Sequence, residues 1–157
     1  CLVCSLVVST SAVSLRDLQK ENKLNDRRLK VLQVADIYDP NESIAQQFTK
    51  LESKFIDFNS GMLLSEYKDY NIDEYDQLTA TKNPQLSIKV DASDDIAIIK
   101  NRENIGKIYI LRNEIGEINK LILPIRGYGL WGTLYGYIAI KDDFNTVSGI
   151  EINKLRF

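Results

Sequence analysis

Histidine is absent from the 157 residues of this chain, and cysteine occurs only at Cys1 and Cys4. Histidine is the commonest general base and the commonest metal ligand in proteins. Its absence excludes a Ser-His-Asp or Cys-His hydrolase built from this chain alone, and two cysteines are too few for a structural zinc site. The sequence therefore predicts no catalytic acid or base and no metal site.

An excess of basic residues is also lacking. Lys and Arg total 20 against 22 Asp and Glu, which gives a formal net charge of −2. Proteins that bind nucleic acid use clustered Lys and Arg to neutralise phosphates, so we expect no nucleic-acid partner. Hydrophobic residues make up 44% of the chain and charged residues 27%. These values are ordinary for a globular protein and allow a packed core.

Residues 1–15, CLVCSLVVSTSAVSL, carry no charge. As a helix this segment covers only about 22 Å of the ~30 Å hydrocarbon core of a bilayer. It can be the apolar part of a signal peptide, a buried helix or strand, or the second part of a transmembrane helix. The small residues favour the last interpretation, so we expect a partial transmembrane helix in contact with membrane lipid. Cys1 and Cys4 then act as small apolar residues.

Residues 16–35 lack glycine and proline, and their leucines recur at helical spacing. This pattern predicts a connecting helix whose surface is mostly solvated. Asp39-Pro40-Asn41 predicts a turn, after which Asn41 or Ser43 can cap a short helix that reaches Leu51.

Strand patterns gather in residues 36–157. Residues 55–64 alternate weakly around Asn59-Ser60-Gly61, which predicts a hairpin with glycine at positive φ. A short helix is expected near residues 73–79. Further strands are predicted at residues 86–90, 105–111, 118–125, 133–140 and 147–152. The fold class is therefore α+β, with helices first and then a mainly antiparallel sheet. Because the last strand would be an unprotected edge, we expect the sheet to be incomplete at the C-terminus.

Residues 123–137, LPIRGYGLWGTLYGY, contain four of the eight glycines. Glycine at this density allows the backbone to approach a flat ligand closely. The alternative is a glycine-rich bend that packs Trp131 into the core, and spacing alone favours this alternative because aromatic residues are mostly core material. The stretch is not a phosphate loop, since it contains neither G-x-x-x-x-G-K-[ST] nor a strand-to-helix G-x-G-x-x-G.

The same residues 123–137 resemble the signature of covalent-FMN domains, L-P-hydrophobic-x-G-x-G-L-W followed by a hydrophobic-Tyr strand. More narrowly, they resemble the NqrC family, which belongs to the sodium-translocating NADH:quinone oxidoreductase. Residues 1–19 are similar to the single transmembrane helix of that family and its exit, and residues 26–35 to the helix that follows. Residues 75–77 and 145–150 match as well, so the resemblance follows the chain in order over nearly its whole length.

The resemblance implies a subunit of the bacterial inner membrane, held by one helix, whose soluble FMN-binding-type domain (residues 36–157 here) lies in the periplasm. It implies electron transfer within a complex of several subunits that exports sodium and reduces ubiquinone. It also implies FMN bound through a phosphoester to the threonine of a late S-G-A-T-x-T motif. By motif match, the residues near the flavin are Gly127, Gly129, Leu130, Trp131 and Thr133.

The chain departs from this family at the flavin attachment. The motif S-G-A-T-x-T does not occur, and Thr79-Ala80-Thr81 echoes it only superficially and at a different place. The family's P-G-L-G segment after the fourth strand is replaced by residues 151–157. We therefore expect no covalent FMN on the chain as given. Two alternatives stay open: the equivalent flavin subunit of the Rnf-type ion-translocating oxidoreductase, and a membrane-tethered structural or assembly piece without redox chemistry.

Overall fold

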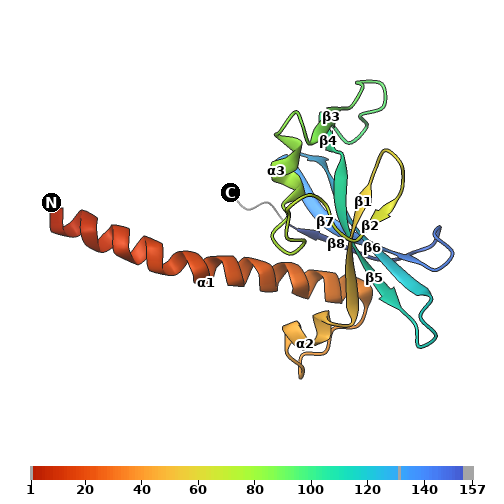
Figure 1. Cartoon of the computed structure of the whole chain (residues 1–157), viewed down its shortest axis with the longest axis horizontal. Helices are drawn as coiled ribbons and strands as arrows, with labels where there is room; N and C mark the ends of the chain where they lie inside the picture. The colour runs from red at the N-terminus through yellow and green to blue at the C-terminus, as the bar shows by residue number, and fades with distance from the viewer. Residues whose placement is uncertain (1, 131, 154–157) are drawn as a thin grey trace.

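A long helix leads into a six-stranded sheet (Figure 1). The computed structural model describes residues 2–130 and 132–153. Helix α1 runs from Leu2 to Ala35, so the segments expected at 1–15 and 16–35 form one continuous helix. Its 34 residues make it about 50 Å long. Its N-terminal part projects away from the rest of the molecule, and its last turns lie against the sheet (Figure 1).

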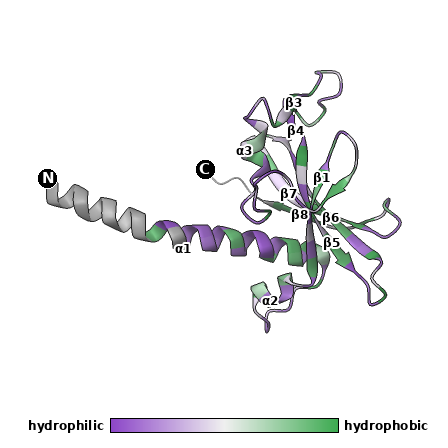
Figure 2. Ribbon diagram, viewed as in Figure 1, coloured by the Kyte–Doolittle hydropathy of each residue, from purple (hydrophilic) through white to green (hydrophobic). Residues whose placement is uncertain are grey.

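The two parts of α1 differ in their surroundings. Leu15 and Leu18 are exposed, whereas Leu32 is fully buried. In the coloured part of α1, which begins at Leu15, the turns that precede the sheet are mostly hydrophilic (Figure 2). Within residues 2–130 and 132–153, no helix has an apolar stretch long enough to cross a membrane.

Helix α1 ends in a Schellman motif. Asp36 takes a positive φ of 61°, and the N–H of Ile37 donates to the carbonyl of Leu32 at 3.1 Å. This arrangement satisfies carbonyls that the helix itself leaves unpaired. The Nζ of Lys120 donates to the carbonyl of Ala35 at 2.7 Å, which ties the helix end to the sheet.

The short helices begin where side chains cap them. Ser43 caps α2 (Ile44–Phe48), as predicted, by accepting a hydrogen bond from the N–H of Gln46. The prediction that this helix reaches Leu51 was wrong, because Leu51 pairs with Leu111 in the sheet. Helix α3 (Gln77–Thr81) starts after the cap Asp76, slightly later than expected.

The main sheet is antiparallel, as predicted. Its strands are β1 (Leu51–Asp57), β2 (Leu63–Leu64), β5 (Ile105–Arg112), β6 (Ile118–Gly129), β7 (Gly132–Lys141) and β8 (Val147–Asn153). Their order is β2-β1-β5-β6-β7-β8. Strands β5 to β8 form a meander, and the β1–β2 hairpin, with Gly61 at φ 73°, pairs on the other side of β5.

A second, two-stranded sheet stands apart from the main one. It pairs β3 (Ser87–Lys89) with β4 (Asn101–Glu103). Strand β3 was predicted, although not its separate location. Strand β4 was missed because Asn101, Arg102 and Glu103 show no apolar alternation.

Two buried clusters lie on one face of the main sheet, which we call the inner face; on the opposite face, Ile108 and Ile110 of β5 are fully buried as well. Near the end of α1, a helix cluster joins buried residues of α1, α2 and the sheet: Val31, Leu32, Val34, Ala35, Phe48, Leu51, Tyr109, Leu111, Ile122 and Ala139. Near α3 lies a smaller aromatic cluster: Phe55, Tyr75, Ala80, Leu86 and Ile105. Because Leu51 and Phe55 are four residues apart on β1, both clusters occupy the same face.

Candidate functional site

The glycine-rich stretch is the far end of the β6–β7 hairpin. Strand pairing continues through Gly127 opposite Leu134 to Gly129 opposite Gly132. The chain reverses between Gly129 and Gly132, and Gly132 has a φ of 129°, a conformation that favours glycine. The stretch is therefore a paired ribbon on both sides of a tight reversal, and the alternative that packs Trp131 into the core stays a prediction. Trp131 lies outside the described residues.

The hairpin places the predicted flavin-site residues on different faces. Successive residues of a strand point to opposite faces, so Gly127 and Gly129 open onto the outer face, opposite to the core. Thr133 shares its face with Tyr135 and belongs to the inner side. Leu130 lies at the tip with 89% of its surface exposed. The structure therefore brings Gly127 and Gly129 together but separates them from Thr133.

A shallow hollow lies beside Gly127, with a volume of about 270 Å³. Its walls are mostly apolar or aromatic: Ile125, Arg126, Gly127, Tyr128, Leu134, Tyr135, Gly136 and Ile152. Ligand sites for flat organic molecules are lined in this way, with few polar groups. We call it the outer hollow.

The glycines of the hairpin have different structural roles. A Cβ on Gly136 would overlap the backbone oxygen of Glu151, so glycine is needed there for β8 to pair closely. A Cβ on Gly127 would meet only Ala97, at 3.7 Å, which is ordinary contact. Gly127 thus lies between Ala97 and the outer hollow, and a larger side chain there would occupy space at the edge of the hollow.

A loop, residues 91–100, holds the outer end of β6. The N–H of Tyr128 donates to the carbonyl of Ala97 at 2.8 Å. The carboxylate of Asp95 accepts from the N–H groups of Ile99 and Lys100, each at 2.8 Å. These bonds fix the loop against the hairpin.

A buried ion pair ties the hairpin to the small sheet. The Nη2 of Arg126 lies 3.0 Å from the Oε2 of Glu103, whose other oxygen accepts from Gln77 at 2.8 Å. Arg126 also donates to the carbonyl of Asn101 at 2.5 Å. Since Arg126 directly precedes Gly127, this network sets the position of the outer hollow relative to α3.

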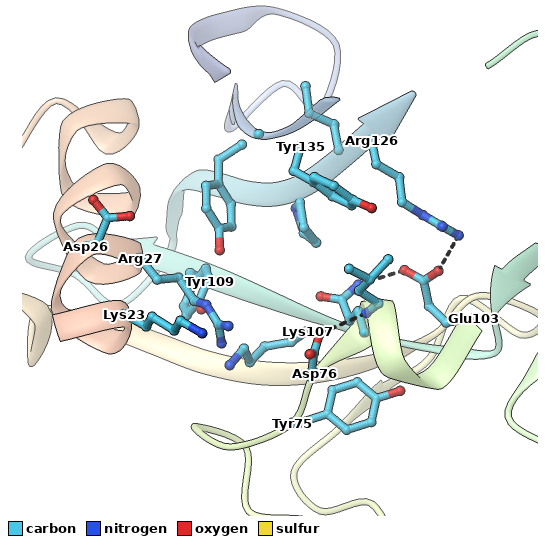
Figure 3. Close-up of a pocket in the computed structure, with 16 residues that line it drawn as sticks. Lys23, Asp26, Arg27, Tyr75, Asp76, Glu103, Lys107, Tyr109, Arg126 and Tyr135 are labelled. Carbon is cyan, nitrogen blue, oxygen red and sulfur yellow. Dashed lines mark hydrogen bonds and ion pairs between the residues drawn. The ribbon is translucent and has the colours of Figure 1, made fainter. Parts of the chain in front are cut away.

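A second pocket lies on the inner face, between α1 and α3 (Figure 3). We call it the inner pocket; its volume is about 430 Å³. Lys23 and Arg27 reach it from α1, and Lys107 and Tyr109 from β5. None of these four residues was predicted as a site residue from the sequence. A signal was nonetheless present, because Lys107 interrupts the otherwise apolar strand I-G-K-I-Y-I-L.

Burial changes the ionisation of groups in the inner pocket. Only 5% of the surface of Lys107 is exposed, and burial, together with Arg27 nearby, lowers its pKa to about 8. Burial raises the pKa of Tyr109 and that of Tyr137, whose rings meet edge-to-face with their centroids 6.2 Å apart. In the described part of the chain, no three His, Cys, Asp or Glu side chains gather as a metal site requires.

Comparison with known proteins identifies relatives along nearly the whole chain. It is 42% identical over 150 residues to NqrC, the C subunit of the Na(+)-translocating NADH-quinone reductase, of Vibrio vulnificus strain YJ016, covering 95% of this chain. The same protein of Pseudomonas aeruginosa is 40% identical over 153 residues, again covering 95% of this chain. This chain is a homologue of NqrC. No protein-family model matches it, and it spans 57% of the length of both relatives.

Solved structures of NqrC agree with this homology. The crystal structure of Shewanella oneidensis NqrC superposes with a TM-score of 0.74 at 28% identity, covering 85% of this chain and 60% of that one. The corresponding protein from Parabacteroides distasonis gives a TM-score of 0.62 at 22% identity over 88% of this chain and 57% of that one, a likeness of fold alone. The family resemblance and the α+β fold expected from the sequence are therefore confirmed, and they favour NqrC over the Rnf-type and non-redox alternatives.

Proposed function

We propose that the chain is part of an NqrC electron-transfer subunit of a Na+-translocating NADH-quinone reductase, and that its outer hollow forms one wall of an FMN site. The observation that carries the proposal is the L-P-x-x-G-x-G-L sequence at the end of β6, beside that hollow. The homology supports the reductase, because the relatives are named as subunits of this oxidoreductase.

The residues of the outer hollow fit the ring system of a flavin. Gly127 leaves its side of the hollow open, and Ile125, Leu134 and Ile152 supply apolar surface. Tyr128 and Tyr135 also line the hollow, although strand alternation directs their side chains to the inner side. The attachment threonine of S-G-A-T-x-T is not among the 157 residues, so the fit concerns the ring and not the covalent bond.

The chain's own residues would hold and shield such a ring. A flavin supplies the capacity to accept and release one or two electrons. Apolar side chains at Ile125 and Leu134 exclude water from one side of the ring, which lowers the local dielectric. The Arg126–Glu103 ion pair keeps the hairpin in position, since it fastens the residue next to Gly127. The exposed Leu130 at the tip suits contact with another subunit.

The proposal also includes a membrane anchor at residues 1–15 and a periplasmic location for residues 36–157. Helix α1 projects from the sheet with its N-terminus far from the hairpin (Figure 1). An anchor at that end would place residues 36–157 outside the bilayer, next to the other subunits of the complex. Cross-linking of the chain to these subunits in membranes would test this arrangement.

Flavin binding tests the central claim. We expect the 157-residue chain to quench the fluorescence of added FMN and of riboflavin saturably. Gly127→Leu should weaken both affinities by at least about tenfold, roughly 1.4 kcal/mol, because the new side chain would enter the hollow. Ile115→Ala is the matched control, because Ile115 is exposed in the turn at the opposite end of β6.

Two results would show that the outer hollow is not the flavin site: the chain does not quench either flavin, or Gly127→Leu quenches both as strongly as the unaltered chain. The second candidate function is that of an assembly piece without redox chemistry. It predicts a different result: the tagged chain would co-purify with the other reductase subunits but would not quench either flavin.

A further inference from the structure

Three cationic side chains meet in the inner pocket. Lys23 and Arg27 extend from neighbouring turns of α1, and their charged ends point toward that of Lys107 on β5 (Figure 3). Arg27 is half-buried and Lys107 is buried, so solvent screens their charges less than at the surface. Three positive charges held this close repel one another unless an anion lies between them.

The acidic residues of the pocket are engaged elsewhere. Asp26 forms an ion pair with Lys30 at 3.3 Å and points away from the three cations (Figure 3). Asp76 caps α3 by accepting from the N–H of Leu78 at 3.0 Å, and Glu103 pairs with Arg126. None of the ion pairs between described residues involves Lys23, Arg27 or Lys107.

Lys107 shows this excess of positive charge most clearly. Its Nζ donates to the carbonyls of Ile72 at 2.7 Å and Asp73 at 3.5 Å, which satisfy hydrogen bonds but supply no full negative charge. The carboxylates of Asp73 and Asp76 attract it from a distance, but no described carboxylate forms an ion pair with it. A buried ammonium group with so little counter-charge destabilises a folded protein. Such a group is typical of a site whose ligand brings the missing charge.

We propose that the inner pocket binds the phosphate group of a small phosphate monoester. A guanidinium and two ammonium groups match a dianionic oxyanion in charge and in hydrogen-bond donors. The pocket volume of about 430 Å³ exceeds what an inorganic ion fills and lies in the range of sites for small organic ligands. The organic part would contact Pro124 and the ring of Tyr135, which also line the pocket.

The three cations lie outside the outer hollow. The inner pocket and the outer hollow share Ile125, Arg126, Tyr135 and Gly136 as walls, but Lys23, Arg27 and Lys107 line only the inner pocket. The proposal therefore does not rest on flavin binding, and a phosphate monoester without a flavin ring can test it.

Isothermal titration of the 157-residue chain with phenyl phosphate provides the test. We expect saturable binding that is weakened at least about tenfold by Arg27→Gln. Lys23→Gln should weaken it less, because Lys23 is exposed. Benzyl alcohol, which lacks the anion, should not bind, and inorganic phosphate should bind more weakly than phenyl phosphate.

A control isolates the site. Arg16→Gln removes an exposed cation from the same helix and should leave the affinity for phenyl phosphate within about twofold. Circular dichroism should show that Arg27→Gln folds normally. Absence of binding at about 10 mM ligand, corresponding to less than ~3 kcal/mol, would overturn the proposal. Equal affinity in Arg27→Gln and the unaltered chain would overturn it too.

Discussion

The helix cluster and the aromatic cluster cover the same face of one sheet but are assembled differently. The helix cluster uses aliphatic side chains that α1 presents at regular spacing, such as Val31, Leu32 and Ala35. The aromatic cluster is brought together by loops and the short α3: Phe55 meets Tyr75 edge-to-face at 5.3 Å, and the Tyr75 hydroxyl donates to the carbonyl of Ile105 at 2.8 Å. Periodic packing fills one end of the face, and aromatic contacts from irregular segments fill the other.

The space between the two clusters is the polar part of the inner face. On β5, Ile105 belongs to the aromatic cluster and Tyr109 to the helix cluster, while Lys107 lies between them on the same face. Neither cluster extends over Lys107, and the inner pocket opens there. The buried charge of Lys107 is therefore retained on the part of the inner face that neither cluster covers.

Loss of the central ring of the aromatic cluster should have the largest effect. Phe55 is 1% exposed, and Phe55→Ala removes a ring that contacts both Tyr67 and Tyr75. We expect the free energy of unfolding to fall by about 4 kcal/mol, measured by urea denaturation. A loss below about 1 kcal/mol would show that irregular segments refill the space.

The matched change in the helix cluster should cost somewhat less. Leu32 is fully buried, and Leu32→Ala should lower the free energy of unfolding by about 3 kcal/mol. Circular dichroism and tyrosine fluorescence should report the same midpoint if both clusters unfold together. Separate midpoints would show that the clusters are independent units.

The pH dependence of stability should report on Lys107 between the clusters. Its pKa is about 8 in the folded chain and about 10.4 when unfolded, so the unfolded state binds more protons between these values. Stability should therefore rise with pH, by about 2 kcal/mol from pH 7 to pH 9.5. The raised pKa values of Tyr75, Tyr109 and Tyr137 act in the opposite direction above about pH 10.

Urea denaturation at several pH values would measure this rise. Lys107→Met should abolish it and leave the tyrosine effect at higher pH. A rise of equal size in the Lys107→Met variant would assign the effect to other groups.

A change at the contact between α1 and the sheet should affect the helix cluster alone. A Cβ on Gly149 would lie 2.6 Å from the backbone oxygen of Val34, so Gly149→Ala must move the helix away from β8. We expect a loss of about 2 kcal/mol. Hydrogen exchange should increase in α1 and remain unchanged at Phe55; faster exchange at both places would contradict the separation of the clusters.

The smallest effect is expected at the cap of α2. Ser43 accepts a hydrogen bond from the N–H of Gln46 at 3.3 Å, and Ser43→Ala should cost about 1 kcal/mol. Thermal unfolding would measure it, with Ser93→Ala, in an exposed loop, as the control. An equal change in both variants would argue against a capping role.

Much of the fold could be predicted because its signals are local. The cap at Ser43, the positive φ of Gly61 and the strands of the β5–β8 meander all follow from residues close together in the sequence. The prediction that Leu51 is helical failed. Its helical spacing from Phe48 suggested a helix, but its conformation is set by strand pairing with Leu111, which is distant in the sequence. Strand β4 was missed for a similar reason, since it forms through pairing with β3 and not through its own apolar pattern.

The candidate site was predicted only in part. The motif located the hairpin, but the faces of its residues depend on strand register, which separates Thr133 from Gly127. The inner pocket joins Arg27 of α1 to Lys107 of β5, residues eighty positions apart. No spacing rule connects such residues, because their approach depends on where α1 lies on the sheet.

By itself, the sequence determined most of the helices and strands, the absence of histidine chemistry and the family to which the chain is related. These properties depend on local backbone preferences and on residues that stand next to one another in a motif. The tertiary structure alone decided that two clusters share one face and that three cations meet between them. It also decided that the glycines of the hairpin open on the opposite side. Those outcomes depend on strand pairing and helix docking, which bring distant residues within contact distance.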